Sequence, residues 1–212
     1  FKNTEGTPEN IRKFHPNIIV SSTGSAPLLP PITGLKDRID NENYNIYSIL
    51  GMISHINDFP KDLEGKKVVV VGGGAVGLDV VEFFADRNAD ISIVEMMDQI
   101  GRDLDPVSKN DTKTMMKKHN VHQLTKTALL EVKDSSFLVR GDGEPYELPF
   151  EYGFVCLGMR AQGQLYQNLT EEFSSEDVEI MNIGDSQRAR RIIDGTQEGR
   201  NILTILEQKG YL

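Results

Sequence analysis

The segment VVVVGGGAVG at residues 68–77, followed by IVE at residues 93–95, decides the fold of this chain. Its run of four valines predicts a strand buried on both faces, as in a parallel sheet that other elements cover on each side. Apolar residues at helical spacing then predict a helix over residues 78–87, and residues 91–94 predict a second short strand. Together they form a strand–helix–strand unit of about the usual length, ~30 residues.

The glycines between the first strand and the helix have the spacing Gly-x-Gly-x-x-Gly. Gly72 permits a tight turn, Gly74 lets the backbone approach a pyrophosphate without an intervening Cβ, and Gly77 allows close packing of helix on strand. The N-terminus of the helix then offers free N–H groups and a partial positive charge. The residues expected to bind a dinucleotide pyrophosphate are Gly72, Gly73, Gly74, Ala75, Val76 and Gly77.

Glu95 ends the second strand, 23 positions after the first glycine (95 − 72 = 23). An acidic residue there accepts the hydroxyls of an adenosine ribose and repels a 2′-phosphate. No Arg or Lys follows until Arg102, which favours NADH over NADPH. The alternative interpretation is that residues 72–77 are only a tight turn and that Glu95 is only a solvated strand end. The strand, the helix and Glu95 together favour dinucleotide binding.

Composition narrows the class of protein. The 212 residues suggest one or two domains, and a net charge of −9 argues against a nucleic-acid or anionic-membrane partner. No apolar run approaches the ~20 residues of a membrane span, so a cytoplasmic protein is expected. The chain starts Phe1-Lys2-Asn3 rather than with Met, which suggests a piece of a larger protein.

The single cysteine, Cys156, excludes an intrachain disulfide, a CxxC pair and a cysteine-rich metal site. Within an apolar strand it is expected to be a small buried hydrophobe. His119 and His122 are three apart but have no third ligand nearby, so no metal site is expected.

The remaining elements follow from hydrophobic periodicity and turn residues. Ser48 is a candidate helix cap, and Gly141-Asp142-Gly143 supplies a hairpin turn. The expected strands are 17–22, 129–139, 146–150, 153–157 and 178–183, and the expected helices are 44–56, 105–120 and 192–206.

Residues 68–79 with 93–96 resemble the NADH-binding domain of the pyridine-nucleotide-disulfide-reductase-like flavoproteins. Three further blocks support the resemblance: residues 16–27 are similar to a strand with an A-T-G-x-x-P turn, 154–160 to the family's second glycine turn, and 183–185 to its FAD-binding G-D motif.

The fold class that the resemblance implies is α/β: a Rossmann-like NAD(P)-binding domain inserted in a partial FAD-binding domain, of the three-layer sandwich type. The expected domains are 1–62 (partial FAD domain and linker), 63–162 (NADH domain) and 163–212 (return to the FAD domain).

Residues 94–101, 104–106 and 191–195 resemble one branch of that superfamily: the 2-enoate reductases, 2,4-dienoyl-CoA reductases and bile-acid-type NADH:flavin oxidoreductases. The branch implies an N-terminal barrel with FMN and an iron–sulfur cluster. NADH would reduce FAD, and electrons would pass through the cluster to FMN and then to an activated C=C bond. The sequence leaves two alternative functions open. One is an NADH oxidase or ferredoxin-reductase-like flavoprotein, which shares every nucleotide motif seen here. The other is a non-enzymatic NAD-sensing module, which would not need the blocks at 23–24 and 184–185.

The family's first GxGxxG, its cysteine cluster and its barrel have no counterpart in this sequence. Ser22 replaces the alanine of A-T-G, Ser186 stands where many relatives have Cys, and Ala161-Gln162 replaces a proline-containing segment. The resemblance therefore implies a C-terminal piece, inactive by itself. The strands at 17–22 and 178–183 should pair as a two-stranded remnant with an open edge. Such a remnant predicts poor FAD retention, and either a homodimer or a disordered remnant.

Residue roles outside the glycine motif also come from the resemblance. Asp79 would lie near the nicotinamide, or be a first-turn acid that stabilises the helix dipole. Gly158 would face the nicotinamide half, or be a simple turn glycine. Thr23 and Gly24 would lie near the FAD pyrophosphate, or serve the turn alone. Asp185, after Gly184, would hydrogen-bond FAD, or cap a helix.

Overall fold

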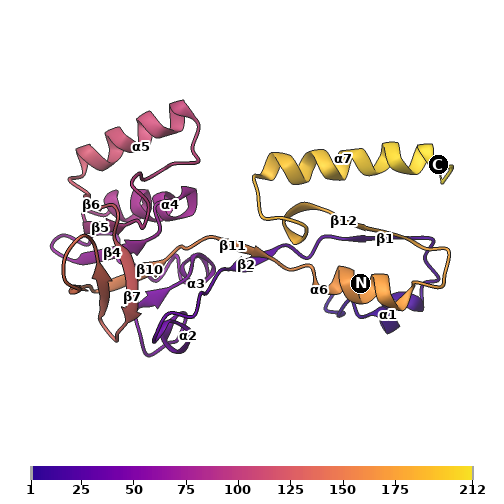
Figure 1. Ribbon diagram of the computed structural model, residues 1–212, viewed down its shortest axis with the longest axis horizontal. Coiled ribbons are helices and arrows are strands. Elements are labelled where there is room, and N and C mark those ends of the chain that lie inside the picture. Colours follow the sequence, from indigo (N-terminus) through magenta and orange to yellow (C-terminus); the bar gives the residue numbers. More distant parts are fainter. Residues whose placement is uncertain (1, 212) are drawn as a thin grey trace. The chain divides into compact units, whose positions relative to one another are not determined.

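The computed structural model describes residues 2–211. The chain divides into two units, and it passes from one to the other at residues 26/27 and again at 158/159 (Figure 1). Unit 2 is Pro27–Gly158, and unit 1 contains the residues on either side of it. Unit 2 begins before residue 63, the expected start of the NADH domain, because the segment after Pro27 packs on the sheet that carries the glycine motif.

A parallel sheet of five strands forms the centre of unit 2, in the order β3-β10-β4-β5-β6. Helix α4 packs on one face and also contacts α5, while a three-stranded antiparallel sheet, β7-β8-β9, and helix α2 contribute to the core on the other. The bounds are β3 Ile46–Tyr47, β10 Tyr152–Val155, β4 Lys67–Val71, β5 Asp90–Val94, β6 His122–Leu124, α4 Ala75–Ala85, α5 Pro106–Lys118, β7 Ala128–Val132, β8 Ser136–Arg140, β9 Tyr146–Pro149 and α2 Leu35–Arg38. The α/β fold class is confirmed.

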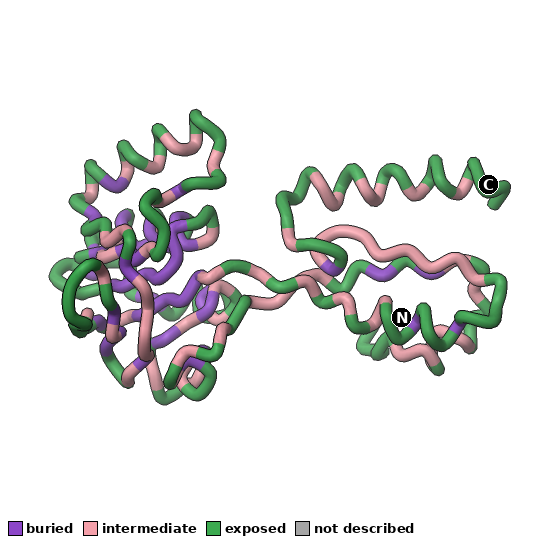
Figure 2. The backbone as a smooth tube through the Cα atoms, viewed as in Figure 1, coloured by how far each residue is buried: buried purple, intermediate pink, exposed green. Residues whose placement is uncertain are grey.

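The valine strand β4 alternates between two cores. Val68 and Val70 pack with the α4 side, whereas Val69 and Val71 pack with the β7-β8-β9 side. All four are buried (Figure 2). The strand is therefore apolar along its whole length because both faces of the sheet are covered, as the sequence predicted.

Aromatic rings fill the core on the α4 side. Phe84 is fully buried, and its ring centroid lies 4.8 Å from that of Phe154 and 5.2 Å from that of Phe59. These rings join the helix, the sheet and the segment that leads into β4. Helix α4 is thus held against the sheet by a packed aromatic core.

The predicted extent of two elements was wrong. The single strand at 129–139 is two strands, β7 and β8, joined by a turn in which Lys133 N–H donates to the Ser136 carbonyl at 2.9 Å. Asp134 and Ser135, typical turn residues, interrupt the run. A bulge in β7 further shifts its register between Leu129 and Glu131.

The helix expected over 44–56 is shorter, because its first residues form the edge strand β3 and bury Ile46 against the sheet. The helix α3 is Ile49–Ser54. Ser48 is its N-cap as predicted, since its Oγ accepts from Gly51 N–H at 3.1 Å. Ser48 itself donates from N and Oγ to Asp40 at 2.8 and 2.6 Å.

Unit 1 contains a two-stranded parallel sheet, β1 (Ile18–Ser21) with β12 (Glu179–Asn182), in the register Ile18↔Glu179. The expected pairing of these two segments is confirmed. Helices α6 and α1 pack with this sheet through a small core of Ile19, Leu169 and Phe173. The other elements of unit 1 are α1 Pro8–Arg12, α6 Gln164–Glu172, α7 Ile192–Gln208 and the short 3₁₀ turn Gly184–Ser186; β11 Met159–Ala161 pairs with β2 Ser25–Pro27.

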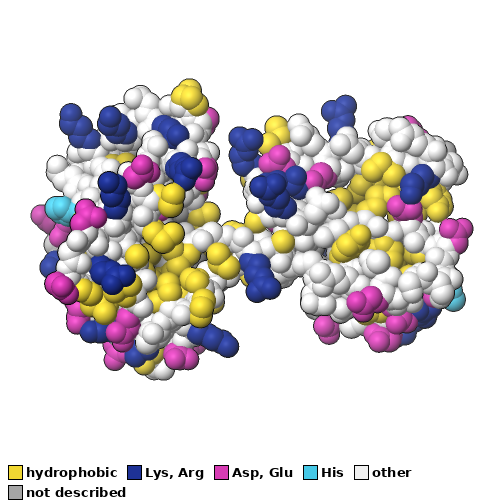
Figure 3. Space-filling view, in the orientation of Figure 1, with side chains coloured by type: hydrophobic (Ala, Val, Ile, Leu, Met, Phe, Trp, Pro, Cys, Tyr) yellow, Lys and Arg dark blue, Asp and Glu magenta, His cyan; other side chains and the backbone are white. Residues whose placement is uncertain are grey.

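Helix α7 follows the predicted bounds closely, but none of its described residues is buried. Unit 1 exposes hydrophobic side chains (Figure 3), and on α7 Ile192 is 91% exposed, with Ile193 and Leu203 also above one half. This unit therefore has much less core than unit 2. No helix within residues 2–211 has the length and apolarity to cross a membrane.

Candidate functional site

The glycine turn connects β4 to α4 under tight steric limits. Gly72 has φ +109°, and a Cβ added there would lie 2.2 Å from the Cys156 carbonyl oxygen. A Cβ on Gly77 would lie 1.9 Å from the Gly72 carbonyl oxygen. Both distances are far below any real contact, so the fold itself requires glycine at the first and third motif positions.

Gly74 is different because the fold places nothing near it. It is the N-cap of α4, its φ is −79°, and a Cβ added there would meet no atom within 4 Å. It has no side chain to cap the helix, so the first-turn N–H groups of α4 lack an acceptor from the N-cap residue. The missing Cβ leaves room for a ligand to approach these donors.

Glu95 reaches back from the end of β5 to the glycine turn. Its Oε2 accepts from Gly73 N–H at 2.6 Å and its Oε1 from Met97 N–H at 2.8 Å. The residue is half-buried, and backbone donors hold its carboxylate on both sides. It therefore stands beside the turn in a fixed orientation, where the motif spacing predicted it.

A hollow of about 580 Å³ in unit 2 brings these residues together. Gly158 closes one side with φ +108° and open space where a Cβ would stand, and its carbonyl accepts from Leu28 N–H at 2.9 Å. The hollow is lined by Pro30, Ile32, Val71, Gly72, Gly74, Ala75, Val76, Val94, Glu95, Met96, Thr127, Ala128, Leu129, Cys156, Leu157 and Gly158. Apart from Glu95 and Thr127 its side chains are apolar, and a gathering of such side chains is visible on unit 2 in Figure 3.

Arg102 also reaches this region, and the sequence reasoning did not place it there. It lines a smaller hollow of about 250 Å³ together with Gly73, Gly74 and Glu95. The chain turns back at Gly101, whose φ is +66° and whose N–H donates to the Gly73 carbonyl at 2.7 Å. A glycine directly before Arg102 was the signal in the sequence that could have marked this return.

Lys109 of α5 holds the backbone on the other side of Arg102. Its Nζ donates to the Arg102 carbonyl at 2.7 Å. The start of α5 is fixed in turn by Asp105, its N-cap, which accepts from the N–H groups of Val107 and Ser108. The segment that carries Arg102 is thus tied both to the glycine turn and to the helix that follows.

Asp79 lies in the second turn of α4, so the alternative of a first-turn acid is wrong. It lines a separate hollow of about 360 Å³ between α4 and α5, together with Glu82 and Asp111. The residue as a whole is exposed, yet partial desolvation of its carboxyl raises the pKa above the ordinary value. Its expected place near the nicotinamide stays a prediction.

Cys156 is buried at 8% exposure, as the sequence predicted. Burial first, and the charge of Asp79 second, raise the pKa of its thiol to about 12. The thiol is therefore neutral at physiological pH and packs behind the glycine turn.

The Thr23–Gly24 turn in unit 1 is tied to a neighbouring segment. The Thr23 hydroxyl donates to the Gln162 carbonyl, and Gln162 N–H donates to the Gly24 carbonyl at 3.0 Å. Gly24 has φ +76° with open space where a Cβ would stand. Thr23 therefore has a structural role in this turn, whereas Gly24 leaves room for a ligand.

Asp185 does not cap α7, because the N-cap of that helix is Arg191. Its carboxylate accepts from Ser25 Oγ at 3.2 Å and from Arg190 N–H at 3.1 Å. Gly184 N–H donates to Glu198 Oε2 at 2.7 Å. The G-D block is therefore linked to both β2 and α7 within unit 1.

A family model described as pyridine nucleotide-disulphide oxidoreductase matches residues 2–181. The chain belongs to this family. The match covers the glycine turn, Glu95 and Gly158 in unit 2 and the Thr23–Gly24 turn in unit 1. The match therefore assigns the chain to a family of oxidoreductases that is named for pyridine nucleotides.

Two curated relatives match most of the chain. A metal reductase of Desulforamulus reducens is 26% identical over 93% of this chain, and an NADH oxidase of Thermoanaerobacter brockii is 26% identical over 90% of it. The matched region is 32% of the first relative and 28% of the second. The chain thus spans about a third of the length of these relatives.

A solved structure has the same arrangement of elements. A 2-naphthoyl-CoA reductase in complex with 2-naphthoyl-CoA superposes with a TM-score of 0.76 at 22% identity, over 93% of this chain and 28% of that one. This likeness supports the fold. Among residues 2–211 no group of three or more His, Cys, Asp or Glu side chains is arranged to hold a metal ion.

Proposed function

We propose that unit 2 binds NADH, with the pyrophosphate at residues 72–77 and the adenosine ribose at Glu95. The observation that carries the proposal is the contrast between the motif glycines. The fold requires Gly72 and Gly77, whereas the space beside Gly74 is open. A glycine that the fold does not need, at the start of α4 where no N-cap side chain bonds the helix, fits a site that a phosphate approaches.

The rest of the large hollow suits the remainder of the dinucleotide. Glu95 supplies two oxygens that each accept one backbone N–H and keep capacity for a ribose hydroxyl. Near Gly158 the hollow is lined by apolar side chains, among them Ile32 and Leu157. Such a lining suits a flat ring. When bound, NADH supplies the hydride of the reaction.

We propose further that Gly24, Gly184 and Asp185 of unit 1 face FAD in a protein of the relatives' length. The open space beside Gly24 fits a pyrophosphate, and each Asp185 oxygen keeps capacity for a ribityl hydroxyl. Thr23 fits less well, because its hydroxyl already donates to the Gln162 carbonyl.

The proposed activity of the whole protein is hydride transfer from NADH to FAD and reduction of an activated C=C bond. The resemblance of residues 94–101 and 191–195 to the enoate-reductase branch supports this substrate class. The second candidate is an NADH oxidase, which the relative of that name favours. In the enoate-type protein, a barrel with FMN and an iron–sulfur cluster would be the partner that accepts the electrons.

The test is a titration of the full chain with NADH and with NADPH, in which calorimetry or nucleotide fluorescence measures the binding. The expected result is saturable NADH binding that is tighter than NADPH binding and weakened by Gly74→Ala. Absence of NADH binding by a folded chain would overturn the proposal. Equal affinity for the two nucleotides would contradict the proposed role of Glu95, which is to favour NADH over NADPH.

A further inference from the structure

Met96 directly follows Glu95 and lines the large hollow of unit 2, yet it is 68% exposed. The residues on either side of it are fixed by backbone hydrogen bonds. The Glu95 carbonyl accepts from Thr127 N–H at 2.9 Å, and the Met97 carbonyl accepts from Lys126 N–H at 2.9 Å. The Met96 side chain therefore starts from a defined point beside the proposed ribose site and is open to solvent.

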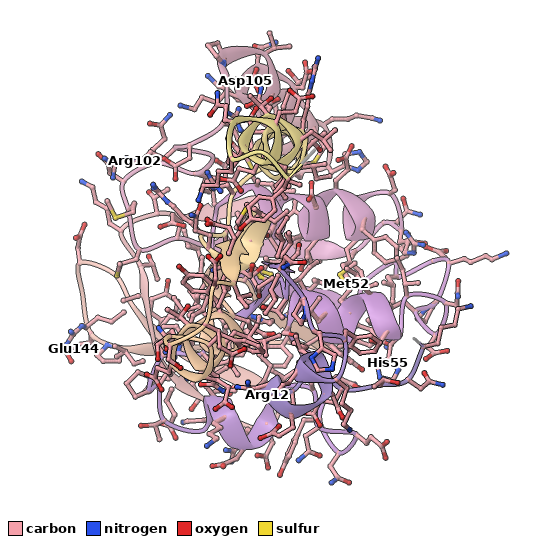
Figure 4. The ribbon with its side chains drawn as sticks, turned by 90° about the vertical axis from the view of Figure 1, so that its right-hand side faces the viewer. Arg12, Met52, His55, Arg102, Asp105 and Glu144 are labelled. Atoms are coloured by element: carbon pink, nitrogen blue, oxygen red, sulfur yellow. The ribbon has the colours of Figure 1, made fainter. Side chains whose placement is uncertain are left out.

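The other methionines are less accessible than Met96. The chain has seven methionines, all within residues 2–211, and only Met96 and Met97 are exposed. Met97 is 39% exposed and lines the smaller hollow rather than the large one. Met52 of α3, labelled in Figure 4, is 4% exposed, and Met116 of α5 is 5% exposed. A dissolved oxidant therefore reaches the thioether of Met96 most readily.

Oxidation of this thioether would change the chemistry of the hollow. A sulfoxide replaces a flexible apolar side chain by a polar one whose oxygen accepts hydrogen bonds. Among the described residues that line the hollow, no side chain is a strong donor for this oxygen. The Glu95 carboxylate only accepts, and the Thr127 hydroxyl already donates to the Thr125 carbonyl at 2.9 Å. A nucleotide that covered the sulfoxide would take it out of water without a side-chain partner, which costs free energy.

We propose that Met96 is a redox-sensitive modification site, and that its oxidation to the sulfoxide by a hydroperoxide weakens dinucleotide binding. The proposal rests on the proposed function, in which Glu95 holds the adenosine ribose next to Met96. Peroxide would thereby reduce the binding of the hydride donor.

The oxidation step balances with hydrogen peroxide as the only co-reactant. The sulfur lone pair attacks one peroxide oxygen, an S–O bond forms and the O–O bond breaks. The leaving hydroxide combines with the proton of the transferred hydroxyl to give water. Sulfur loses two electrons and the peroxide gains them. Methionine sulfoxide reductases reduce the product back to the thioether, so the modification is reversible.

The experiment treats the full chain with hydrogen peroxide and then removes the peroxide with catalase. Peptide mass spectrometry locates the sulfoxides, and calorimetry measures NADH affinity. Met96 is expected to oxidise at least about tenfold faster than the buried Met52 and Met116. Once Met96 is oxidised, NADH affinity should fall about fivefold, and a methionine sulfoxide reductase should restore it.

Met96→Leu and Met97→Leu assign the effect to one residue, because leucine keeps the side chain apolar but has no sulfur. Each variant is compared with its own untreated sample, so a direct effect of the substitution on affinity cancels. Peroxide should lower the affinity of Met96→Leu by less than about twofold. Met97→Leu, the matched control, should lose as much affinity as wild type.

Three results would overturn the inference. Oxidation of Met96 with unchanged NADH affinity would show that the sulfoxide does not oppose binding. Oxidation of Met52 or Met116 ahead of Met96 would show that Met96 is not the accessible thioether. Protection by Met97→Leu instead of Met96→Leu would move the site to Met97. Failure of the untreated chain to bind NADH is a distinct outcome, in which the proposed function itself fails and the inference falls with it.

Discussion

The backbone N–H of Gly73 donates to Glu95 Oε2 at 2.6 Å. This bond joins the glycine turn after β4 to the end of β5, the two segments that the dinucleotide motif requires side by side. A second bond, from Met97 N–H to Oε1 at 2.8 Å, fixes the other oxygen. The carboxylate is therefore oriented before any ligand arrives, which lowers the ordering cost of binding.

Glu95→Gln is expected to weaken NADH binding about tenfold and to reduce the preference over NADPH. A glutamine side chain has one acceptor oxygen, so one of the two backbone N–H groups loses its acceptor, at a cost of about 1–3 kcal/mol in stability. Titration with both nucleotides and urea unfolding measure the two effects. Glu82→Gln, an exposed position of α4, is the matched control and should change neither. An unchanged nucleotide preference in Glu95→Gln would contradict the assignment.

Gly74→Ala and Gly77→Ala should separate binding from folding. The added methyl at position 74 meets no protein atom, so stability should fall by less than about 1 kcal/mol, while affinity for NADH falls at least about tenfold. The methyl at position 77 meets the Gly72 carbonyl oxygen at 1.9 Å, and overpacking of this kind costs about 1–3 kcal/mol.

Urea unfolding and NADH titration of both variants check this pair. A Gly77→Ala protein as stable as wild type would show that the helix can move away from the strand. Undiminished NADH binding by Gly74→Ala would show that no ligand approaches the open face of the turn.

The sequence predicted the glycine unit because local signals agree there. The valine run, the glycine spacing and Glu95 each indicate the same strand–helix–strand unit, and the structure contains it. The pairing of β1 with β12 joins segments far apart in sequence, and only the family resemblance predicted it.

Elements that depend on tertiary contacts were missed. Strand β3 has two residues and exists because Ile46 and Tyr47 pair with β10. Helix α6 begins after Gly163 with no side-chain cap, so no start signal marks it. Arg102 is separated from Glu95 along the chain, and the turn at Gly101 that brings it back depends on a bond to Gly73.

Unit 1 is expected to retain FAD poorly when the chain is purified alone. Its sheet β1-β12 has two strands, and Ile192 and Leu203 of α7 are largely exposed, so little core supports the proposed FAD residues. Self-association through the open sheet edge is the expected consequence. Absorbance at flavin wavelengths and sedimentation measure both properties. A monomer with stoichiometric FAD would contradict the prediction.

The Cys156 thiol should make stability depend on pH in the alkaline range. Its folded pKa is about 12, raised mainly by burial, whereas an unfolded thiol titrates near pH ~8.5. The contribution to stability is therefore complete below the unfolded pKa and is lost as pH rises toward the folded one. From about pH 8 to about pH 10 the loss should approach ~2 kcal/mol.

Urea unfolding of wild type and Cys156→Ala at several pH values isolates this contribution, because the other titrating groups are common to both proteins. The free energy of unfolding of wild type should fall relative to that of Cys156→Ala as pH rises. In parallel, the native thiol should resist alkylation at about pH 8 and react once urea unfolds the chain, since the thiolate is the reactive form. Rapid labelling of the folded protein, or a pH-independent difference, would show that the thiol is not held neutral behind the glycine turn.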